Sequence, residues 1–278
     1  MSTRINHNIL SLAARRNLYQ TQLNLEQAVA RLSSGLRINA SWEDPAGLAV
    51  SEKFRAQIAS FQEAERNANY NINLLETAEG ALSVIDEKLI RLRALAVQAA
   101  NGALQDSDRS ILNTEYQALL DEIDRIAQVT NYNGHYLIDG TYASTPITFQ
   151  VGTNATSGED FYTINIDDMT TSGLGISVTD ISTVASAQAA ITALDNAIAS
   201  KDVQRTALGA YVARLQNAIL NLQIARENAI KSESTIRDAD IAEEMSNFVR
   251  SQILMQSGVA MLAQANTVPQ MLARLITG

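Results

Sequence analysis

Apolar residues recur at helical spacing near the start of the chain, between residues 5 and 38. From Leu18 onward the steps are seven, four, three and four, which is typical of an amphipathic helix with a coiled-coil seam. The apolar positions are Ile5, Ile9, Leu12, Leu18, Leu25, Val29, Leu32 and Leu36. Most of the remaining polar positions carry amide side chains. We therefore predict a long helix that needs a partner along one side.

The far end of the chain, residues 241–278, has a different pattern. Between Ser251 and Ala273 there is no charged residue, but amides and hydroxyls interrupt the apolar run, so it is too polar to cross a lipid bilayer. Its apolar residues spread over more than one helical face: Met245, Phe248, Val249, Ile253, Leu254, Met261, Leu262, Met271, Leu272 and Leu275. A helix with this distribution is normally buried. Because both termini are rich in amides, we expect the two ends to pair and other helices to cover them.

The longest helical pattern runs from residue 44 to residue 100. Asp44-Pro45 favours a helix start, and Asn101-Gly102 favours a stop. Between them, apolar residues from Phe61 to Ala99 follow steps of seven, four and three without a proline. One helix of this length would be about 85 Å long, whereas a compact globule of this chain would be about 50 Å across. The pattern therefore predicts an elongated rod.

The remaining segments complete the predicted order of elements. A third helix is expected at 107–129, and a fourth begins near 185 and continues to about 232, with Gly209 as a weak point. Between them, short alternating runs at 135–138, 146–151 and 161–166, with turn residues such as Asn133-Gly134, indicate a small β region. The fold class is mainly α: an elongated rod of long antiparallel helices in coiled-coil packing, with a small β-hairpin region in the middle of the chain.

Composition and charge narrow the range of partners. With 21 basic and 30 acidic side chains the net charge is -9, which disfavours a nucleic-acid or anionic-membrane binder. There is no cysteine, so no disulfide or thiolate metal site is expected. The first residues lack the unbroken apolar stretch of a secretory signal peptide, so any export is expected to use another route.

Catalytic patterns are missing from the sequence. The two histidines, His7 and His135, belong to different segments, and neither forms a metalloprotease pair. Asp238-Ala239-Asp240 begins like a calcium loop, but the glycine and the later acidic residue of that loop are absent. We predict that the chain is not an enzyme and that it binds no cofactor or metal.

Several blocks, taken together, resemble the bacterial flagellin family. They are RINHNILSL, RLSSGLRINASWEDPAGLAVSEKFRAQI, RLRALAVQAANG, EIDRIAQVTNYNG, ESTIRDADIAEEM and QANTVPQMLARLI. Their joint order and spacing are more specific than any single block. The resemblance implies three regions. Residues 1–43 with 236–278 would form a terminal coiled-coil domain that lines the filament core. Residues 44–140 with 185–235 would form a helical rod domain, and residues 141–184 a short β insertion without separate outer domains.

The resemblance also implies a function. Flagellins are structural subunits that polymerise into the flagellar filament used for motility, through packing of their terminal helices. The residues expected to pack in the filament core are Ile5, Ile9, Leu12, Leu25, Val29, Leu32, Leu36, Phe248, Ile253, Leu254, Met261, Leu262, Met271, Leu272 and Leu275. The terminal segments of the free monomer are expected to be disordered and to fold on assembly.

Partners and location follow from the same resemblance. The chain is expected to bind itself in a helical homopolymer, a flagellar export chaperone, the filament cap and the hook-filament junction proteins. Export is expected through a flagellar type III apparatus. The filament is expected outside the cell, and a periplasmic filament stays open as an alternative.

A second binding role concerns an innate-immune Toll-like receptor. In flagellins that this receptor senses, an arginine and a leucine on the second helix and a glutamate on the third make the main contact. The matching residues here are Arg91, Leu95 and Glu115, while Ala94 replaces an acidic residue usual in strongly activating members. The alternative is that these residues serve protofilament packing, which we favour for Leu95.

Two other functions stay open. A hook-filament junction protein has similar terminal helices, although the closeness of the terminal blocks to flagellin disfavours it. A binding module built on a free helical bundle would need the terminal run to be buried within one monomer.

Overall fold

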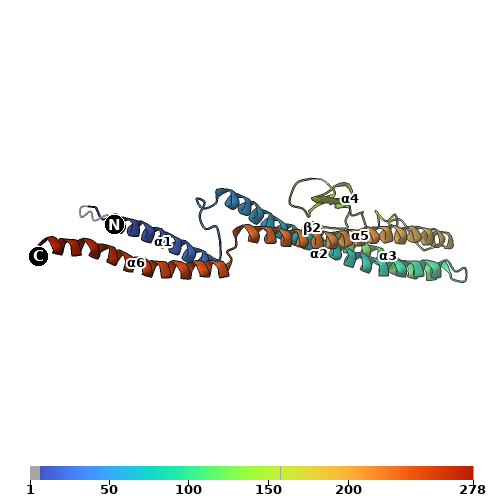
Figure 1. The fold of residues 1–278 in the computed structure, drawn as a ribbon. Coiled ribbons are helices and arrows are strands. Elements are labelled where there is room, and N and C mark those ends of the chain that lie inside the picture. Colours follow the sequence, from blue (N-terminus) through green and yellow to red (C-terminus); the bar gives the residue numbers. More distant parts are fainter. Residues whose placement is uncertain (1–6, 157, 278) are drawn as a thin grey trace. The chain divides into compact units, whose positions relative to one another are not determined.

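The computed structural model describes residues 7–156 and 158–277, and for residues 268–270 and 272–277 it describes the backbone alone. Long helices dominate these residues: α1 (Ile9–Ser34), α2 (Pro45–Ala99), α3 (Asp106–Val129), α5 (Val184–Arg237) and α6 (Ile241–Thr277), together with the short α4 (Thr141–Ser144). Four short strands lie between α3 and α5: β1 (Asn131–Tyr132), β2 (His135–Tyr136), β3 (Ile147–Gln150) and β4 (Phe161–Ile164). The predicted mainly α class with a small β region is confirmed (Figure 1).

The chain divides into two compact units. The terminal unit comprises Met1–Ala56 and Asn228–Gly278, and the bundle unit comprises Gln57–Glu227. Helices α2 and α5 contribute residues to both units, because their bounds cross these limits. The predicted scheme of three regions places its boundaries elsewhere, at 43 and 236, and it stays a prediction.

In the bundle unit, α2 and α5 form an antiparallel pair with a heptad seam. Leu75, Leu82 and Leu89 of α2 are buried at steps of seven. On α5 the buried positions follow the same period: Ala187, Leu194, Lys201, Leu208, Leu215 and Leu222. Ion pairs fix the direction, because each step forward along α2 meets a step backward along α5: Glu65–Arg226, Glu79–Arg205, Asp86–Lys201 and Arg93–Asp195.

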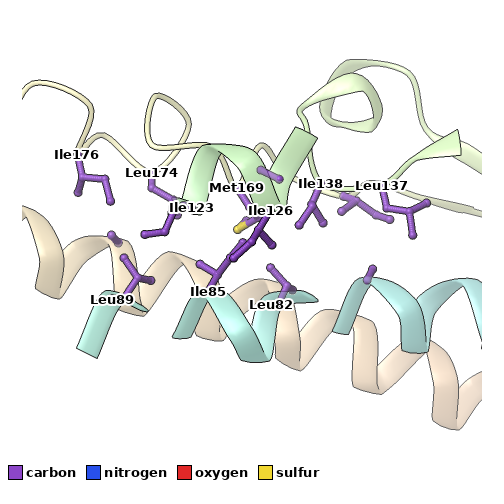
Figure 2. Packing of buried hydrophobic residues seen from close by; sticks show 14 of the residues in the cluster. Leu82, Ile85, Leu89, Ile123, Ile126, Leu137, Ile138, Met169, Leu174 and Ile176 are labelled. Atoms are coloured by element: carbon purple, nitrogen blue, oxygen red, sulfur yellow. The ribbon is translucent and has the colours of Figure 1, made fainter. Parts of the chain in front are cut away.

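Helix α3 and the following loops cover this pair. Ile123 and Ile126 of α3 lie against the seam around Ile85, and Met169 and Leu174 of the loop close over them (Figure 2). Polar contacts fasten the loop to α3. The Asp124 carboxylate accepts hydrogen bonds from the Thr171 backbone N–H at 2.7 Å and from its hydroxyl at 2.8 Å. The bundle unit therefore completes its own apolar core.

The β region is shorter than the alternating runs suggest. β1 pairs with β2 across Asn133-Gly134, and both turn residues have positive φ, as a type I′ hairpin turn requires. The run 135–138 was predicted as one strand, but β2 ends at Tyr136, since Leu137 and Ile138 are both buried in the core (Figure 2). β3 pairs antiparallel with β4 from Ile147↔Ile164 to Gln150↔Phe161.

Candidate self-association surface

The terminal helices α1 and α6 lie side by side and run antiparallel (Figure 1). Asn8 near the start of α1 donates from Nδ2 to the Ala265 carbonyl oxygen near the end of α6, at 2.8 Å. At the other end, Arg31 Nη1 lies 3.0 Å from Glu244 Oε1. Between them Leu18 packs against Gly258, where an added Cβ would lie 3.3 Å from Leu18 Cδ1. The predicted pairing of the two chain ends is confirmed.

Capping residues set the ends of both helices. The Asn8 side chain accepts from the Ser11 N–H at the start of α1, and Gly35 ends this helix with a φ of 71°. Asp240 Oδ1 accepts from the Ala242 and Glu243 N–H groups at the start of α6. The acidic Glu243 and Glu244 lie in this first turn, where their negative charge interacts favourably with the positive end of the helix dipole.

A polar corner ties the segment after α1 to the end of α5. The Arg37 N–H donates to the Arg237 carbonyl at 2.6 Å, and the Arg37 guanidinium donates to the Ile236 carbonyl from Nη2 at 2.5 Å and from Nε at 3.2 Å. On the other side the Ala239 N–H donates to the Gly35 carbonyl at 2.9 Å. Carbonyls at the end of α5 that the helix itself leaves free are thus satisfied by the opposite chain segment.

The α1–α6 pair buries little of its apolar surface. Among the described residues of the terminal unit, the buried hydrophobic side chains are Ala28, Ile38 and Ala229. Large apolar side chains of α1 and α6 are exposed instead: Ile9, Leu10, Leu12, Tyr19, Val29, Ile241, Met245, Val249, Ile253, Leu254, Val259, Met261 and Met271. Large exposed apolar patches on a soluble protein mark interaction sites. We call these exposed residues of α1 and α6 the terminal apolar surface.

The predicted packing residues fall into two groups. Seven are exposed: Ile9, Leu12, Val29, Ile253, Leu254, Met261 and Met271. Five are partly buried: Leu25, Leu32, Leu36, Phe248 and Leu262. Ile5 lies outside the described residues, and so do the side chains of Leu272 and Leu275.

The structure also shows exposed apolar residues that were not among the predicted packing residues. Leu10 and Val259 are exposed members of the terminal apolar surface, and Trp42, the one tryptophan of the chain, is exposed in the loop before α2. Leu10 follows Ile9 directly, so it does not belong to the helical seam from which the packing residues were predicted. Trp42 lies outside any periodic segment, and its being the one tryptophan of the chain is the only signal in the sequence.

Shallow hollows lie between α1 and α6. One of about 390 Å³ includes Leu10, Ala14, Leu18, Gly258 and Met261 in its lining. A second of about 180 Å³ is bordered by Leu10, Ala14, Met261, Gln264 and Ala265. A third, of about 210 Å³, is more polar, with Arg31, Glu244 and Arg250 among its residues. An apolar side chain of another molecule would fit the first two hollows better than the third.

The three residues expected to contact a receptor lie in the bundle unit. Arg91 Nη2 lies 2.6 Å from Glu115 Oε1, so these exposed side chains form an ion pair between α2 and α3. Leu95 is only 1% exposed and belongs to the core of the bundle. The structure thus brings Arg91 and Glu115 together and directs Leu95 inward. Receptor binding itself stays a prediction.

Among the described residues, no helix is both long enough and apolar enough to cross a membrane. Within the same part of the chain, no group of three or more His, Asp or Glu side chains is arranged to hold a metal ion. The expectation of no cofactor stays a prediction.

Family models match both ends of the chain. The bacterial flagellin N-terminal helical region matches residues 5–143, and the bacterial flagellin C-terminal helical region matches residues 191–276. A flagellin of Halalkalibacterium halodurans is 42% identical, covering 98% of this chain and 99% of that protein. A flagellin of Bacillus subtilis is 40% identical, with the same coverage of both chains.

A filament protein and two solved structures extend the comparison. The flagellar filament 33 kDa core protein of Treponema phagedenis is 38% identical, covering 98% of this chain and 99% of that protein. The crystal structure of Bacillus cereus flagellin is 35% identical with a TM-score of 0.50, over 56% of this chain and 88% of that one. A putative flagellar hook-associated protein from Vibrio parahaemolyticus has a TM-score of 0.59, covering 70% of this chain and 100% of that one, but only 17% identity, which shows a shared fold alone. With two family models that together span most of its length and relatives of near-equal size, this chain belongs to the bacterial flagellin family.

Proposed function

We propose that this chain is the structural subunit of a bacterial flagellar filament used for motility, and that it polymerises through the terminal apolar surface. The observation that carries the proposal is the contrast within the terminal unit. Two long helices are capped and paired, yet they leave large apolar side chains exposed along both. The pair gains its remaining apolar burial when other copies pack on it.

Burial of exposed apolar side chains provides a driving force for assembly. Fully burying one Leu, Ile or Met side chain contributes about 1.5–3 kcal/mol. Ile9, Leu12, Ile253 and Met261 are 57–65% exposed, so burying them contributes part of the roughly 4–15 kcal/mol that association costs, and the other members of the terminal apolar surface must supply the rest. The free energy of assembly is available without any change to the bundle core.

The distribution of the surface favours a polymer over a closed dimer. The exposed apolar positions on α6 do not share one face, so a single partner cannot cover all of them. Different faces of one subunit must then meet different neighbours, and a contact is heterologous where one face of a copy packs on another face of the next. Heterologous contacts that do not close into a ring form helical filaments.

The charge-free run of α6 suits a buried position. An unpaired charge in a dry interface is costly, whereas amides and hydroxyls can satisfy one another across helices. Within the pair this is already visible, because Ser11 Oγ lies 3.0 Å from Asn266 Oδ1 and donates to it. Residues 251–273 are therefore suited to contacts among helices of several copies.

The two alternative functions are less well supported. Relatives of about 40% identity over nearly the whole chain carry the name flagellin, whereas the hook-associated protein shares the fold alone. A free helical bundle would need the terminal run buried within one molecule, but Ile253, Val259 and Met261 are exposed.

Seeded growth of purified subunit tests the proposal. The protein should add to filament seeds above a critical concentration, and the variant Ile253→Lys should raise that concentration at least about a hundredfold, because a lysine would be buried without a partner. Val178→Lys, an exposed valine in a loop of the bundle unit, is the matched control. Unchanged growth of Ile253→Lys, or no growth of the parent protein, would contradict the proposal.

Further partners are proposed on family likeness. We propose that an export chaperone, a filament cap and hook-filament junction proteins bind the chain, and that the filament lies outside the cell. Protease digestion of intact cells separates the two locations, because an external filament is accessible and a periplasmic one is protected. Nothing supports a catalytic role, and we propose none.

The Toll-like receptor contact is proposed for Arg91 and Glu115. Both side chains are exposed and already pair with each other, so Arg91→Ala also frees the Glu115 carboxylate. Receptor signalling by the monomer should fall for Arg91→Ala, and comparison with Glu115→Gln separates loss of the arginine from loss of the pair. If neither variant reduces signalling, these residues do not form the contact.

A further inference from the structure

Methionines are concentrated on α6. Of the six in the chain, Met245, Met255, Met261 and Met271 lie on this one helix. Met245 is 46% exposed, Met261 65% and Met271 54%, while Met255 is partly buried. Met169, in the bundle unit, is only 1% exposed. Access to the thioether sulfur therefore differs sharply between the two units.

The most exposed of these side chains lies at the proposed contact surface. Met261 borders both apolar hollows on the α1–α6 pair, together with Leu10 and Ala14. No charged residue is present between Ser251 and Ala273, so its neighbours along α6 carry apolar, amide or hydroxyl side chains. A change in the polarity of Met261 would act directly on the surface that another copy covers.

We propose that the exposed α6 methionines form an oxidation-sensitive site that controls assembly, and this inference rests on the proposed function. A peroxide oxidises these thioethers in the free subunit, and the resulting sulfoxides oppose polymerisation. In the filament the same side chains are covered and resist oxidation. The exposed sulfur atoms thereby make the free subunit, rather than the filament, the vulnerable form.

The chemistry is an oxygen-atom transfer from hydrogen peroxide. The methionine sulfur attacks one peroxide oxygen, the O–O bond breaks, and a sulfur–oxygen bond forms. The sulfur loses two electrons, and the second oxygen leaves as hydroxide, which takes up the proton of the transferred hydroxyl to become water. The product is methionine sulfoxide, a polar side chain with a strong acceptor oxygen.

The effect on assembly follows from burial of that oxygen. In the free subunit the sulfoxide is hydrated, so the fold of the monomer should not change. In a filament contact it would be buried next to apolar side chains, where a polar group without a partner is unfavourable. We expect the critical concentration for growth to rise at least about tenfold for each sulfoxide so buried.

The experiment compares peroxide treatment before assembly with peroxide treatment after assembly. Free subunit is treated with hydrogen peroxide, the peroxide is removed, and the critical concentration for seeded growth is measured with mass spectrometry of each methionine. Oxidation should appear at Met245, Met261 and Met271 before Met169, and the critical concentration should rise. Preformed filaments treated identically should keep Met261 unoxidised.

Matched variants assign the effect to α6. The triple variant Met245→Leu, Met261→Leu and Met271→Leu is compared with itself before and after peroxide, and its critical concentration should not shift, whatever its untreated value. Met169→Leu should remain as sensitive as the parent protein. A methionine sulfoxide reductase should restore growth of the oxidised parent.

The possible outcomes separate the inference from the function on which it rests. If the untreated protein does not polymerise, the proposed function fails and this inference fails with it. If the untreated protein polymerises, and subunits oxidised at Met261 grow at the same critical concentration, the inference alone is overturned. Equal oxidation of Met169 and Met261 in the free subunit would also overturn it.

Discussion

The terminal unit and the bundle unit use the same periodic pattern with opposite results. Leu89 on α2 is fully buried, and Leu12 on α1, at a comparable seam position, is 62% exposed. In the bundle unit a third helix and a loop cover the seam of α2 and α5, as Figure 2 shows. The α1–α6 pair has no comparable cover among the described residues of its unit. Periodicity thus identifies a helix that must be buried but does not tell whether the covering surface belongs to the same molecule.

The polar side chains of the bundle unit and of α6 also differ. Charged pairs cross between α2 and α5 at several levels of the bundle, from Glu65–Arg226 to Arg93–Asp195, and these pairs are completed inside one subunit. Along α6, residues 251–273 carry amides and hydroxyls instead. An ion pair fixes one specific partner, while an amide can donate to or accept from any neighbouring helix. The bundle therefore encodes its own arrangement, and the terminal helices encode compatibility with other copies.

Hydrogen exchange on the monomer is the strongest test of this contrast. Amides of α2 and α5 in the bundle unit should exchange with the free energy of global unfolding, about 5–15 kcal/mol for a typical domain. Residues 5–36 and 241–275 should exchange with almost no protection, because their ordering is coupled to assembly. Protection should then appear in these segments when the same protein is measured in filaments. Strong protection of the termini in the monomer would contradict the contrast.

Core truncations compare the same residue type in the two units. Leu89→Ala should destabilise the monomer by about 2–5 kcal/mol, because it leaves a cavity in a closed core. Leu12→Ala should change monomer stability by less than about 0.5 kcal/mol, as expected for an exposed position. Denaturant unfolding of the two variants measures the difference. For filament growth the order should reverse, with Leu12→Ala raising the critical concentration more than Leu89→Ala does.

Much of the helical framework could be predicted from local signals. Asp44-Pro45 and Asn101-Gly102 predicted the bounds of α2 to within a few residues, because capping and proline effects act locally. Asn133-Gly134 predicted the β1–β2 turn for the same reason. Gly35, in the left-handed conformation, ends α1 within the segment 5–38 whose apolar spacing predicted a helix.

Features that depend on distant residues could not be predicted. Gly209 was expected as a weak point, but α5 continues through it, because burial of Leu208 and Leu215 outweighs a helix-propensity cost of about 1 kcal/mol. In the terminal apolar surface, the two helices and seven of the exposed positions were predicted, while exposed positions such as Leu10 and Val259 were not. Exposure depends on which neighbours are missing, and a single sequence does not contain them.

A smaller effect is expected from the buried ion pair of the bundle, both members of which belong to the same subunit. Lys201 is only 2% exposed and occupies a core position of the heptad between Leu194 and Leu208, with its Nζ paired to Asp86 and 2.7 Å from Asp202. Asp86→Asn should destabilise the monomer by about 1–3 kcal/mol, because it leaves a buried cation with one exposed carboxylate. Lys201→Met should cost less, since it removes the buried charge and keeps the apolar stem.

Thermal unfolding of the parent protein, these two variants and the double variant measures the coupling between the side chains. If Lys201→Met proves more destabilising than Asp86→Asn, the ion pairs of the lysine stabilise the fold by more than burial of its charge costs. Filament growth should change little in either variant, because this pair is completed within one subunit.

The smallest effect is expected from a single carboxylate in the β region. Asp160 has a lowered pKa, chiefly because its carboxylate accepts a hydrogen bond from the Asn154 N–H at 3.0 Å, with a further one from the Thr156 N–H at 3.1 Å, and these outweigh its partial burial. A lowered folded-state pKa stabilises the fold above the unfolded pKa of about 3.9, and the stabilisation disappears as the pH falls through the folded value. Asp160→Asn removes this titration. The difference in unfolding temperature between parent and variant should therefore be constant near neutral pH and shrink below about pH 4. Other carboxylates titrate equally in both proteins, so parallel curves throughout this range would show that the loop adds nothing to the stability of the bundle unit.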